Sequence, residues 1–285
     1  MLGRATSGPD ARRIPVRRYA LSAAGVAVVA LLGLVALLAP LAAPVDPMVM
    51  NPRARLAPPS GAHPMGTDQF GRDILSRVIH GTRISLGVGV GSVALSLGVG
   101  LALGALAASR EGVMDAFVMR GMDVLLAFPA ILLALALMAV LGSKPRNVVF
   151  AIGLVYLPVF ARTARAAILT IKHREFVEAA HALGRADLSR FFRHILPNAL
   201  APMLVQASLS VSTAILAEAA LSFLGVGTQP PTPSWGGMLS ESRAFMEVAP
   251  WTAVFPGVAI MVAVLGFNLL GDGIRDLLDP RLRNL

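Results

Sequence analysis

The sequence predicts an all-α integral membrane protein, and two observations support this. Of its 285 residues, 55% are hydrophobic and only 14% are charged, whereas a soluble domain carries about 25% charged residues. Apolar runs of about 20 residues, the length that crosses a bilayer, also recur along the chain. These runs predict six transmembrane helices, at approximately 20–42, 84–108, 121–142, 148–169, 200–224 and 251–271.

The distribution of Lys and Arg predicts the orientation. With the N-terminus inside, 17 of the 25 basic residues fall on inside segments and 8 on outside segments. Cytoplasmic loops of membrane proteins carry this excess of basic residues. Six spans then place both termini in the cytoplasm. The net charge of +9 reflects this asymmetry and attraction to anionic lipid headgroups, so it needs no nucleic acid.

The N-terminal part is expected to consist of a cytoplasmic tail (1–19) and then the first span with an extracytoplasmic loop (20–83). The first span, with about 23 residues, exceeds the 7–15 apolar residues typical of a signal peptide. We therefore interpret it as an uncleaved anchor. In the loop, Thr67 or Asp68 is predicted to cap a short helix running toward His80.

The core of the protein is assigned to residues 84–271, followed by a cytoplasmic C-terminus at 272–285. The second span is rich in glycine, and small residues four positions apart let helices approach closely. The glycine pairs of this kind are Gly87 with Gly91 and Gly100 with Gly104. The third span contains Phe128 and Pro129, which suggest a static kink or a gating hinge.

Glu218 lies deep inside the apolar run at 200–224. A carboxylate at the middle of a bilayer costs about 2.5–3.5 kcal/mol on insertion scales, so it is expected to face protein or water. One hypothesis is that Glu218 lines a pathway or pairs with an arginine near an outer gate, together with Phe128 and Pro129. The alternative is a structural hydrogen bond between helices.

The polar segment 175–198 separates two bilayer-length runs and is predicted to be an amphipathic helical loop. One face of its first helix is apolar, and acidic residues occupy its first turn, where the helix dipole favours anions. Gly184 is expected to end this helix, and Pro197 to lie in the first turn of the next one. A loop of this kind either rests on the lipid surface or is held by a partner. The apolar face comprises Phe176, Val177, Ala180 and Leu183, and the other side carries Glu175, Glu178 and His181.

The order Glu178-Ala179-Ala180, Gly184 and Ile195-Leu196-Pro197 resembles the EAA motif of permease subunits of ABC importers. The strictest form of that motif has Ile at the position of His194. The resemblance implies that the loop 170–199 is a coupling loop that docks in a groove of a cytoplasmic ATPase. It assigns Glu178 to a polar contact, Ala179 and Ala180 to close packing, and Gly184 to the turn. The coupling residues so implied are Glu175, Glu178, Ala179, Ala180, Gly184, Leu196 and Pro197.

Three further segments, 63–77, 120–129 and 221–243, resemble the C-type permease subunit of the peptide and nickel importer family. That resemblance implies a type I importer transmembrane domain in the bacterial inner membrane, working by alternating access. It also implies an outer loop at 225–250 and di- or oligopeptides as substrates, with nickel, its chelates and glutathione as alternatives. The implied partners are a homologous B-type permease, two ATPase subunits or one fused ATPase, and an external binding protein.

Motifs for catalysis are absent from the sequence. It has no G-x-x-x-x-G-K-[ST] segment, so ATP and Mg are expected on partner ATPase subunits and not on this chain. No metal-binding spacing of His or Cys occurs, and no catalytic residue is proposed. Two other classes stay open: a proton-driven secondary transporter acting through Glu218, and a membrane scaffold without a transport role.

Overall fold

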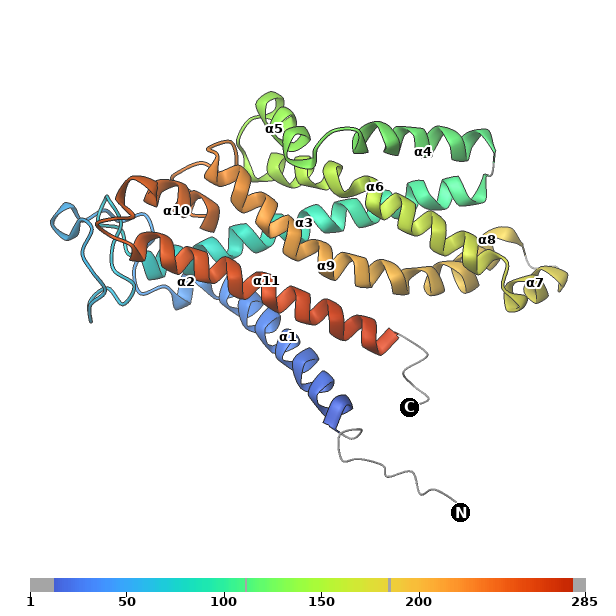
Figure 1. Ribbon diagram of the computed structural model, residues 1–285, viewed down its shortest axis with the longest axis horizontal. Coiled ribbons are helices and arrows are strands. Elements are labelled where there is room, and N and C mark those ends of the chain that lie inside the picture. The colour runs from blue at the N-terminus through green and yellow to red at the C-terminus, as the bar shows by residue number, and fades with distance from the viewer. Residues whose placement is uncertain (1–12, 111, 184–185, 279–285) are drawn as a thin grey trace, which may run out of the picture.

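The computed structural model describes residues 13–110, 112–183 and 186–278, and all regular structure in these ranges is helical. The long helices run roughly along the longest axis of the molecule (Figure 1). Residues 43–73 and α10 lie at one end, here called the loop end, and α7 and α8 lie at the other, called the α7 end. The helices are α1 (Arg13–Leu37), α2 (Ala39–Ala42), η1 (Pro52–Ala54), α3 (Ile74–Ser109), α4 (Val113–Leu126), α5 (Ala130–Leu141), α6 (Pro145–Lys172), α7 (Glu175–Ala182), α8 (Asp187–Arg190), the π-helical turn η2 (Phe191–Ile195), α9 (Leu196–Phe223), α10 (Trp235–Ser242), η3 (Arg243–Phe245) and α11 (Trp251–Leu278).

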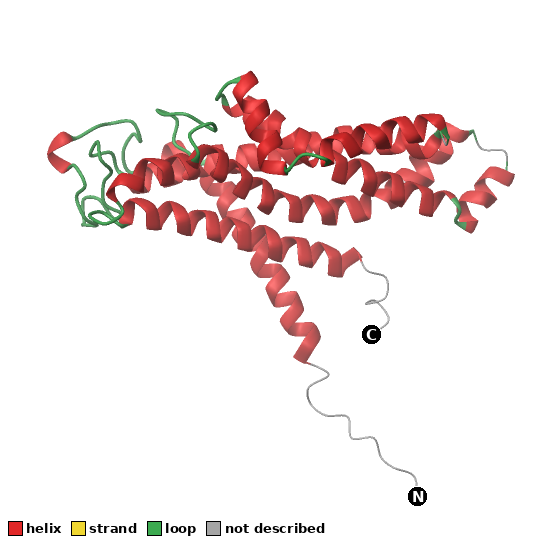
Figure 2. Ribbon diagram, turned by 45° about the horizontal axis from the view of Figure 1, so that its top comes forward, coloured by secondary structure: helices red, strands yellow, loops and turns green. Residues whose placement is uncertain are grey.

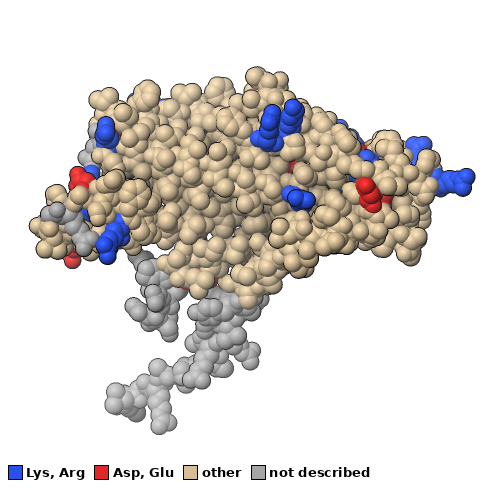
Figure 3. Space-filling view, turned by 180° about the vertical axis from the view of Figure 1, so that it is seen from behind, with Lys and Arg blue, Asp and Glu red and all other residues tan. Residues whose placement is uncertain are grey.

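Four helical stretches of the described chain are long and apolar enough to cross a membrane, and a fifth is added if α4 and α5 count as one broken span. The apolar part of α1, Leu21–Leu37, is shorter than these stretches. Figure 3 shows wide uncharged areas on one side of the molecule, as helices facing lipid require. The four stretches are Ile74–Ser109, Pro145–Lys172, Asp187–Phe223 and Trp251–Leu278.

The segment 121–142, predicted as the third span, is not one continuous helix. The segment forms α4 and α5, which are bent by 90° relative to each other. The last amide bonded in α4 is that of Ala127, which donates to Asp123 O at 3.0 Å. Pro129 then stands at the N-cap of α5, because a residue without an N–H ends the helical ladder and is tolerated at a helix start.

The helix predicted to begin near residue 84 begins ten residues earlier, at Ile74. Its cap is neither Thr67 nor Asp68 but Asp73, whose carboxylate accepts the amide of Ser76 at 2.8 Å. The two predicted caps bond elsewhere: the carbonyl of Thr67 accepts the indole N–H of Trp251 at 3.2 Å. At the N-terminus, α1 begins at Arg13, inside the segment expected to be a tail.

One of the predicted glycine pairs brings two helices together. A Cβ on Gly104 would lie 2.4 Å from the carbonyl oxygen of Ala161, and one on Gly100 would lie 2.6 Å from Cβ of Phe160. Only glycine therefore permits this approach of α3 to α6. The other pair makes no such approach, since the site of Gly87 has nothing within 4 Å. In Figure 2 the non-helical backbone gathers mostly at the loop end.

Candidate coupling surface and buried glutamate

The helix predicted at 175–183 is present as α7, Glu175–Ala182. It follows α6 after a two-residue turn, in which the carbonyl of Arg174 accepts the amide of Val177 at 2.8 Å. Glu175 and Glu178 occupy its first turn, where the positive end of the helix dipole stabilises carboxylates. Figure 1 shows α7 at one extreme of the long axis, beyond the bundle of long helices.

The inner face of α7 packs against its own chain. Val177 is 2% exposed and Ala180 is 6% exposed. Val177 belongs to a small apolar cluster with Ile168 on α6 and Ile195 in η2. The close packing of Ala180, which the family resemblance assigns to the ATPase, is therefore made within this chain.

The outer face of α7 carries a mixture of acidic and apolar side chains that the described chain leaves uncovered. Phe176 is 47% exposed and Leu183 is 82% exposed. A contiguous exposed apolar patch marks an interaction site more often than a free surface. The exposed residues of α7 and its C-cap are Glu175, Phe176, Glu178, Ala179, His181, Ala182 and Leu183.

The outward side of α7 therefore combines residues of both predicted faces. The predicted apolar face is divided, with Val177 and Ala180 inside but Phe176 and Leu183 outside. The outer surface continues into α8 and η2, where Leu188 is 71% and Phe192 is 58% exposed. These four exposed apolar residues, with Glu175, Glu178 and Ala179, are called the coupling surface below.

Of the other residues in the predicted coupling set, Leu196 and Pro197 belong to α9 and not to α7. Gly184 lies outside the described residues. Leu196 is half-buried and Pro197 is exposed in the first turn of α9. A π-helical turn, Phe191–Ile195, precedes them, and such turns are rare and frequent at functional sites.

Glu218 lies in the half of α9 nearer the loop end and is fully buried. Its carboxylate accepts the hydroxyls of Ser222, at 2.8 Å, and Ser85, at 3.1 Å. Because Ser85 belongs to α3, this is a hydrogen bond between helices, as one of the two hypotheses proposed. The Ser85 oxygen also accepts the backbone N–H of Trp235 at 3.3 Å.

The partners of Glu218 were not identified from the sequence. Ser222 lies four residues further along α9, a spacing that a search for helical neighbours would have found. Ser85 is 133 residues away, and no local pattern links the two. Phe128 is 55% exposed at the bend between α4 and α5, so its side chain is available to a second chain or to lipid.

Comparison of the sequence with a family model and with known proteins shows which family the chain resembles. Residues 100–284 match the model of the family described as "Binding-protein-dependent transport system inner membrane component". The dipeptide transport system permease protein DppC of Alkalihalophilus pseudofirmus is 45% identical over 269 residues, covering 94% of this chain and 88% of that protein. The glutathione transport system permease protein GsiD of Pectobacterium atrosepticum is 48% identical over 226 residues, covering 79% of this chain and 75% of that protein.

Among solved structures, the fold resembles the MetNI methionine ABC transporter in inward-facing conformations. The TM-score is 0.61 at 18% identity, with 72% of this chain and 98% of that chain covered. At this identity the likeness concerns the fold alone, an all-helical ABC transporter transmembrane domain. With the family model matching more than half of the chain, the protein belongs to the inner membrane components of binding-protein-dependent transport systems, the permease subunits of ABC importers.

Proposed function

We propose that this permease carries di- or oligopeptides across the bacterial inner membrane, and that the coupling surface receives the motion of a partner ATPase. The coupling surface itself is the observation that carries the second part, since Phe176 and Leu183 are exposed on a helix whose other face is packed. The peptide substrate is supported by the 45% identity to a dipeptide permease over 94% of the chain.

The proposed topology has six spans with both termini in the cytoplasm. Two features support it. Counting the 25-residue helix α1 as a span, together with the four long stretches and the broken pair α4–α5, gives six. In addition, 17 of the 25 basic residues fall on the side so assigned to the cytoplasm. In this orientation α7 is cytoplasmic, and the loop end meets an external binding protein.

ATP and Mg are assigned to the partner ATPases, present as two subunits or one fused protein, and the pathway is shared with a homologous B-type permease. The apolar side chains exposed on α4, namely Val113, Phe117 and Val124, suit contact with that permease or with lipid. In this arrangement ATP and Mg bind to the ATPase subunits, so transport requires no nucleotide or metal site on this chain.

The geometry suggests how ATP-driven motion reaches the membrane. Val177 is held in one cluster with Ile168 on α6 and Ile195 at the start of α9. Because packed side chains transmit displacement, a shift of α7 displaces the adjoining ends of α6 and α9 together. These two helices cross the bundle, so closure of the ATPases alters the arrangement of the spans and supports alternating access.

Glutathione is a second candidate substrate, favoured by the 48% identity to GsiD, and nickel or its chelates are a third. Glutathione is itself a tripeptide, so it belongs to the same chemical class as the first candidate. A proton-driven carrier acting through Glu218 is less well supported, because the partners of this carboxylate are the hydroxyls of Ser85 and Ser222.

The experiment is uptake by the assembled transporter in proteoliposomes, with labelled dipeptide, labelled glutathione or nickel supplied with the binding protein. We expect ATP-dependent uptake of the dipeptide. Uptake of glutathione or nickel alone would overturn the peptide assignment. Uptake by this chain without ATPases, abolished when the proton gradient is dissipated, would overturn the importer mechanism.

A further inference from the structure

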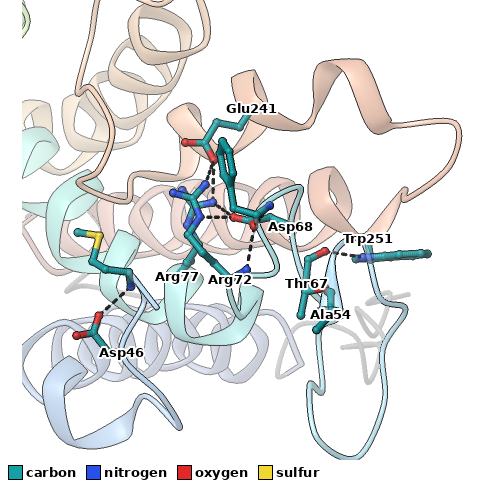
Figure 4. A network of polar contacts seen from close by, with 10 residues as sticks. Asp46, Ala54, Thr67, Asp68, Arg72, Arg77, Glu241 and Trp251 are labelled. Carbon is teal, nitrogen blue, oxygen red and sulfur yellow. Dashed lines mark hydrogen bonds and ion pairs between the residues drawn. The ribbon is translucent and has the colours of Figure 1, made fainter. Parts of the chain in front are cut away.

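A buried group of four charged residues, here called the charge quartet, joins two distant parts of the chain at the loop end (Figure 4). It consists of Asp68, Arg72, Arg77 and Glu241. Arg72 Nε donates to Asp68 Oδ2 at 2.6 Å, and Arg72 Nη2 donates to Glu241 Oε2 at 2.6 Å. Arg77 Nη1 donates to the same Glu241 oxygen at 2.8 Å and also pairs with Asp68.

The members of the charge quartet differ in origin and exposure. Asp68, Arg72 and Arg77 belong to one segment, 66–77, and their side chains are 3–5% exposed. Glu241 comes from α10, and its side chain is 15% exposed. Segment 66–77 thus buries two arginines, Arg72 and Arg77, but contributes only one carboxylate to the charge quartet. The second carboxylate, Glu241, comes from α10. Since buried charges are tolerated when they are balanced by opposite charge, Glu241 favours the docked position of α10 by balancing the second arginine.

Trp235 fixes the other end of α10 to α3. Its side chain is completely buried, and its indole N–H donates to the carbonyl of Val78 at 3.1 Å. Its backbone N–H donates to Ser85 Oγ at 3.3 Å. The ring also lies over Gly81, where an added Cβ would be 3.0 Å from the indole. Trp235 and Glu241 therefore tie the two ends of this short helix to α3 and the segment that precedes it.

Two further contacts fix α10 to α9. A Cβ on Gly236 would lie 2.5 Å from the backbone of Ala219, so the two helices touch at main-chain distance. The carbonyl of Phe223, at the end of α9, accepts the hydroxyl of Ser240 at 2.9 Å and the guanidinium of Arg243 at 3.1 Å. Successive side chains near the end of α10 thus face different neighbours, with Ser240 and Arg243 on α9 and Glu241 on the charge quartet.

We infer that Glu241 is a positioning residue that makes segment 66–77, α10 and the adjoining end of α9 a single rigid body during transport. This inference rests on the proposed function, because it concerns motion in the transport cycle. α10 then does not lift from α3 as a separate gate. The conformational change occurs instead between this body and the rest of the protein.

The test uses the absence of cysteine from the sequence. Spin labels are placed at two exposed alanines, Ala62→Cys beside segment 66–77 and Ala244→Cys after α10. The labelled chain is assembled with cysteine-free partners, and the distance distribution is measured by pulsed EPR without nucleotide and after trapping with ATP and vanadate. We expect one narrow distribution with the same mean in both states. A mean that changes between the states would overturn the inference.

Glu241→Gln in the labelled background removes the charge and keeps the shape. It is expected to broaden the distribution and to lower peptide uptake on the order of tenfold, because the two buried arginines then share the single carboxylate of Asp68. The matched control is Glu247→Gln, an exposed carboxylate beyond α10, which is expected to change neither. An unchanged distribution in Glu241→Gln would contradict the positioning role.

A charge-balanced double variant separates positioning from general loss of structure. Arg77→Gln with Glu241→Gln restores neutrality, since one arginine then faces one carboxylate. Uptake by the double variant should exceed that of either single variant, a non-additive result expected of residues in direct contact. Uptake no better than the weaker single variant would overturn the inference. If the wild-type complex takes up no peptide, the proposed function fails, and the EPR distances still decide whether the body is rigid.

Discussion

The charge quartet at the loop end and the coupling surface at the α7 end differ in how far this chain covers their side chains. At the loop end, charged residues such as Arg72 and Arg77 are 3% exposed and are paired within the chain. At the α7 end, apolar residues such as Phe176 and Leu183 are 47% and 82% exposed. The charges of the quartet are therefore balanced within this chain, whereas the apolar side chains of the coupling surface are left available to a partner.

Within α7, the buried residues have a different role from the exposed ones. Val177 and Ala180 hold α7 to its own bundle, so the coupling surface is presented by a helix that the chain already orients. A preoriented surface loses less conformational freedom when it binds. The following variants test this comparison, from the largest expected effect to the smallest.

Ala179→Asp is expected to have the largest effect on transport. Ala179 is exposed, so the chain should fold and insert normally. An unpaired charge enclosed in the interface with the ATPase costs about 2–5 kcal/mol, and uptake should fall on the order of a hundredfold. Uptake and ATP hydrolysis are measured in proteoliposomes.

The neighbouring variant Ala180→Asp is the matched control. Ala180 is buried against its own chain, so here the defect should appear as poor assembly and low yield of the membrane protein. If both variants fold normally and transport equally well, α7 does not present the faces described.

Glu218→Leu is expected to destabilise the half of the bundle nearer the loop end. It leaves the hydroxyls of Ser85 and Ser222 without their carboxylate, and each unsatisfied buried polar group costs about 1–3 kcal/mol. Thermal unfolding in detergent measures the loss. Glu218→Gln retains an acceptor and should stay close to wild type in stability and uptake. Normal stability with abolished uptake in Glu218→Gln would instead assign this residue to the pathway.

Asp115→Asn is expected to have a smaller effect than the variants above. Asp115 on α4 accepts two bonds from Arg165 on α6, each at 2.5 Å. Because the arginine side chain is 34% exposed, we expect a loss of about 0.5 kcal/mol in stability. The pair Arg162–Asp123, about half exposed on both sides, offers a comparison, and Asp123→Asn should cost still less. A larger loss in Asp123→Asn would contradict this ranking.

Local patterns in the sequence predicted the features that depend on local properties. The apolar runs at 148–169, 200–224 and 251–271 lie within membrane-length helices, except for Leu224, which is the C-cap of α9, because bilayer-spanning helices follow from hydrophobic length. The helical periodicity of α7 and the close approach at Gly104 were likewise visible in single segments.

Features that depend on distant partners were missed. Arg72 and Arg77 were counted among the outside basic residues, but their charges are balanced in part by Glu241, more than 160 residues away. Asp68 was predicted as a helix cap from its local surroundings. Its place in the charge quartet was missed, because the quartet also depends on the distant carboxylate of Glu241. At Pro129 the sequence suggested a static kink or a gating hinge but not the 90° angle between α4 and α5, since it does not indicate how far a broken helix will turn.

The most direct test of the coupling surface is site-specific cross-linking in the assembled transporter. Ala179→Cys and Ala180→Cys, each in the cysteine-free chain, are modified with a photoactivatable maleimide and illuminated, and the products are identified by mass spectrometry. We predict cross-links from residue 179 to the ATPase, and from residue 180 only to α6, η2 or α9 of its own chain. Cross-links from residue 179 to lipid alone would contradict the account, because α7 would then rest on the membrane surface without contacting the ATPase.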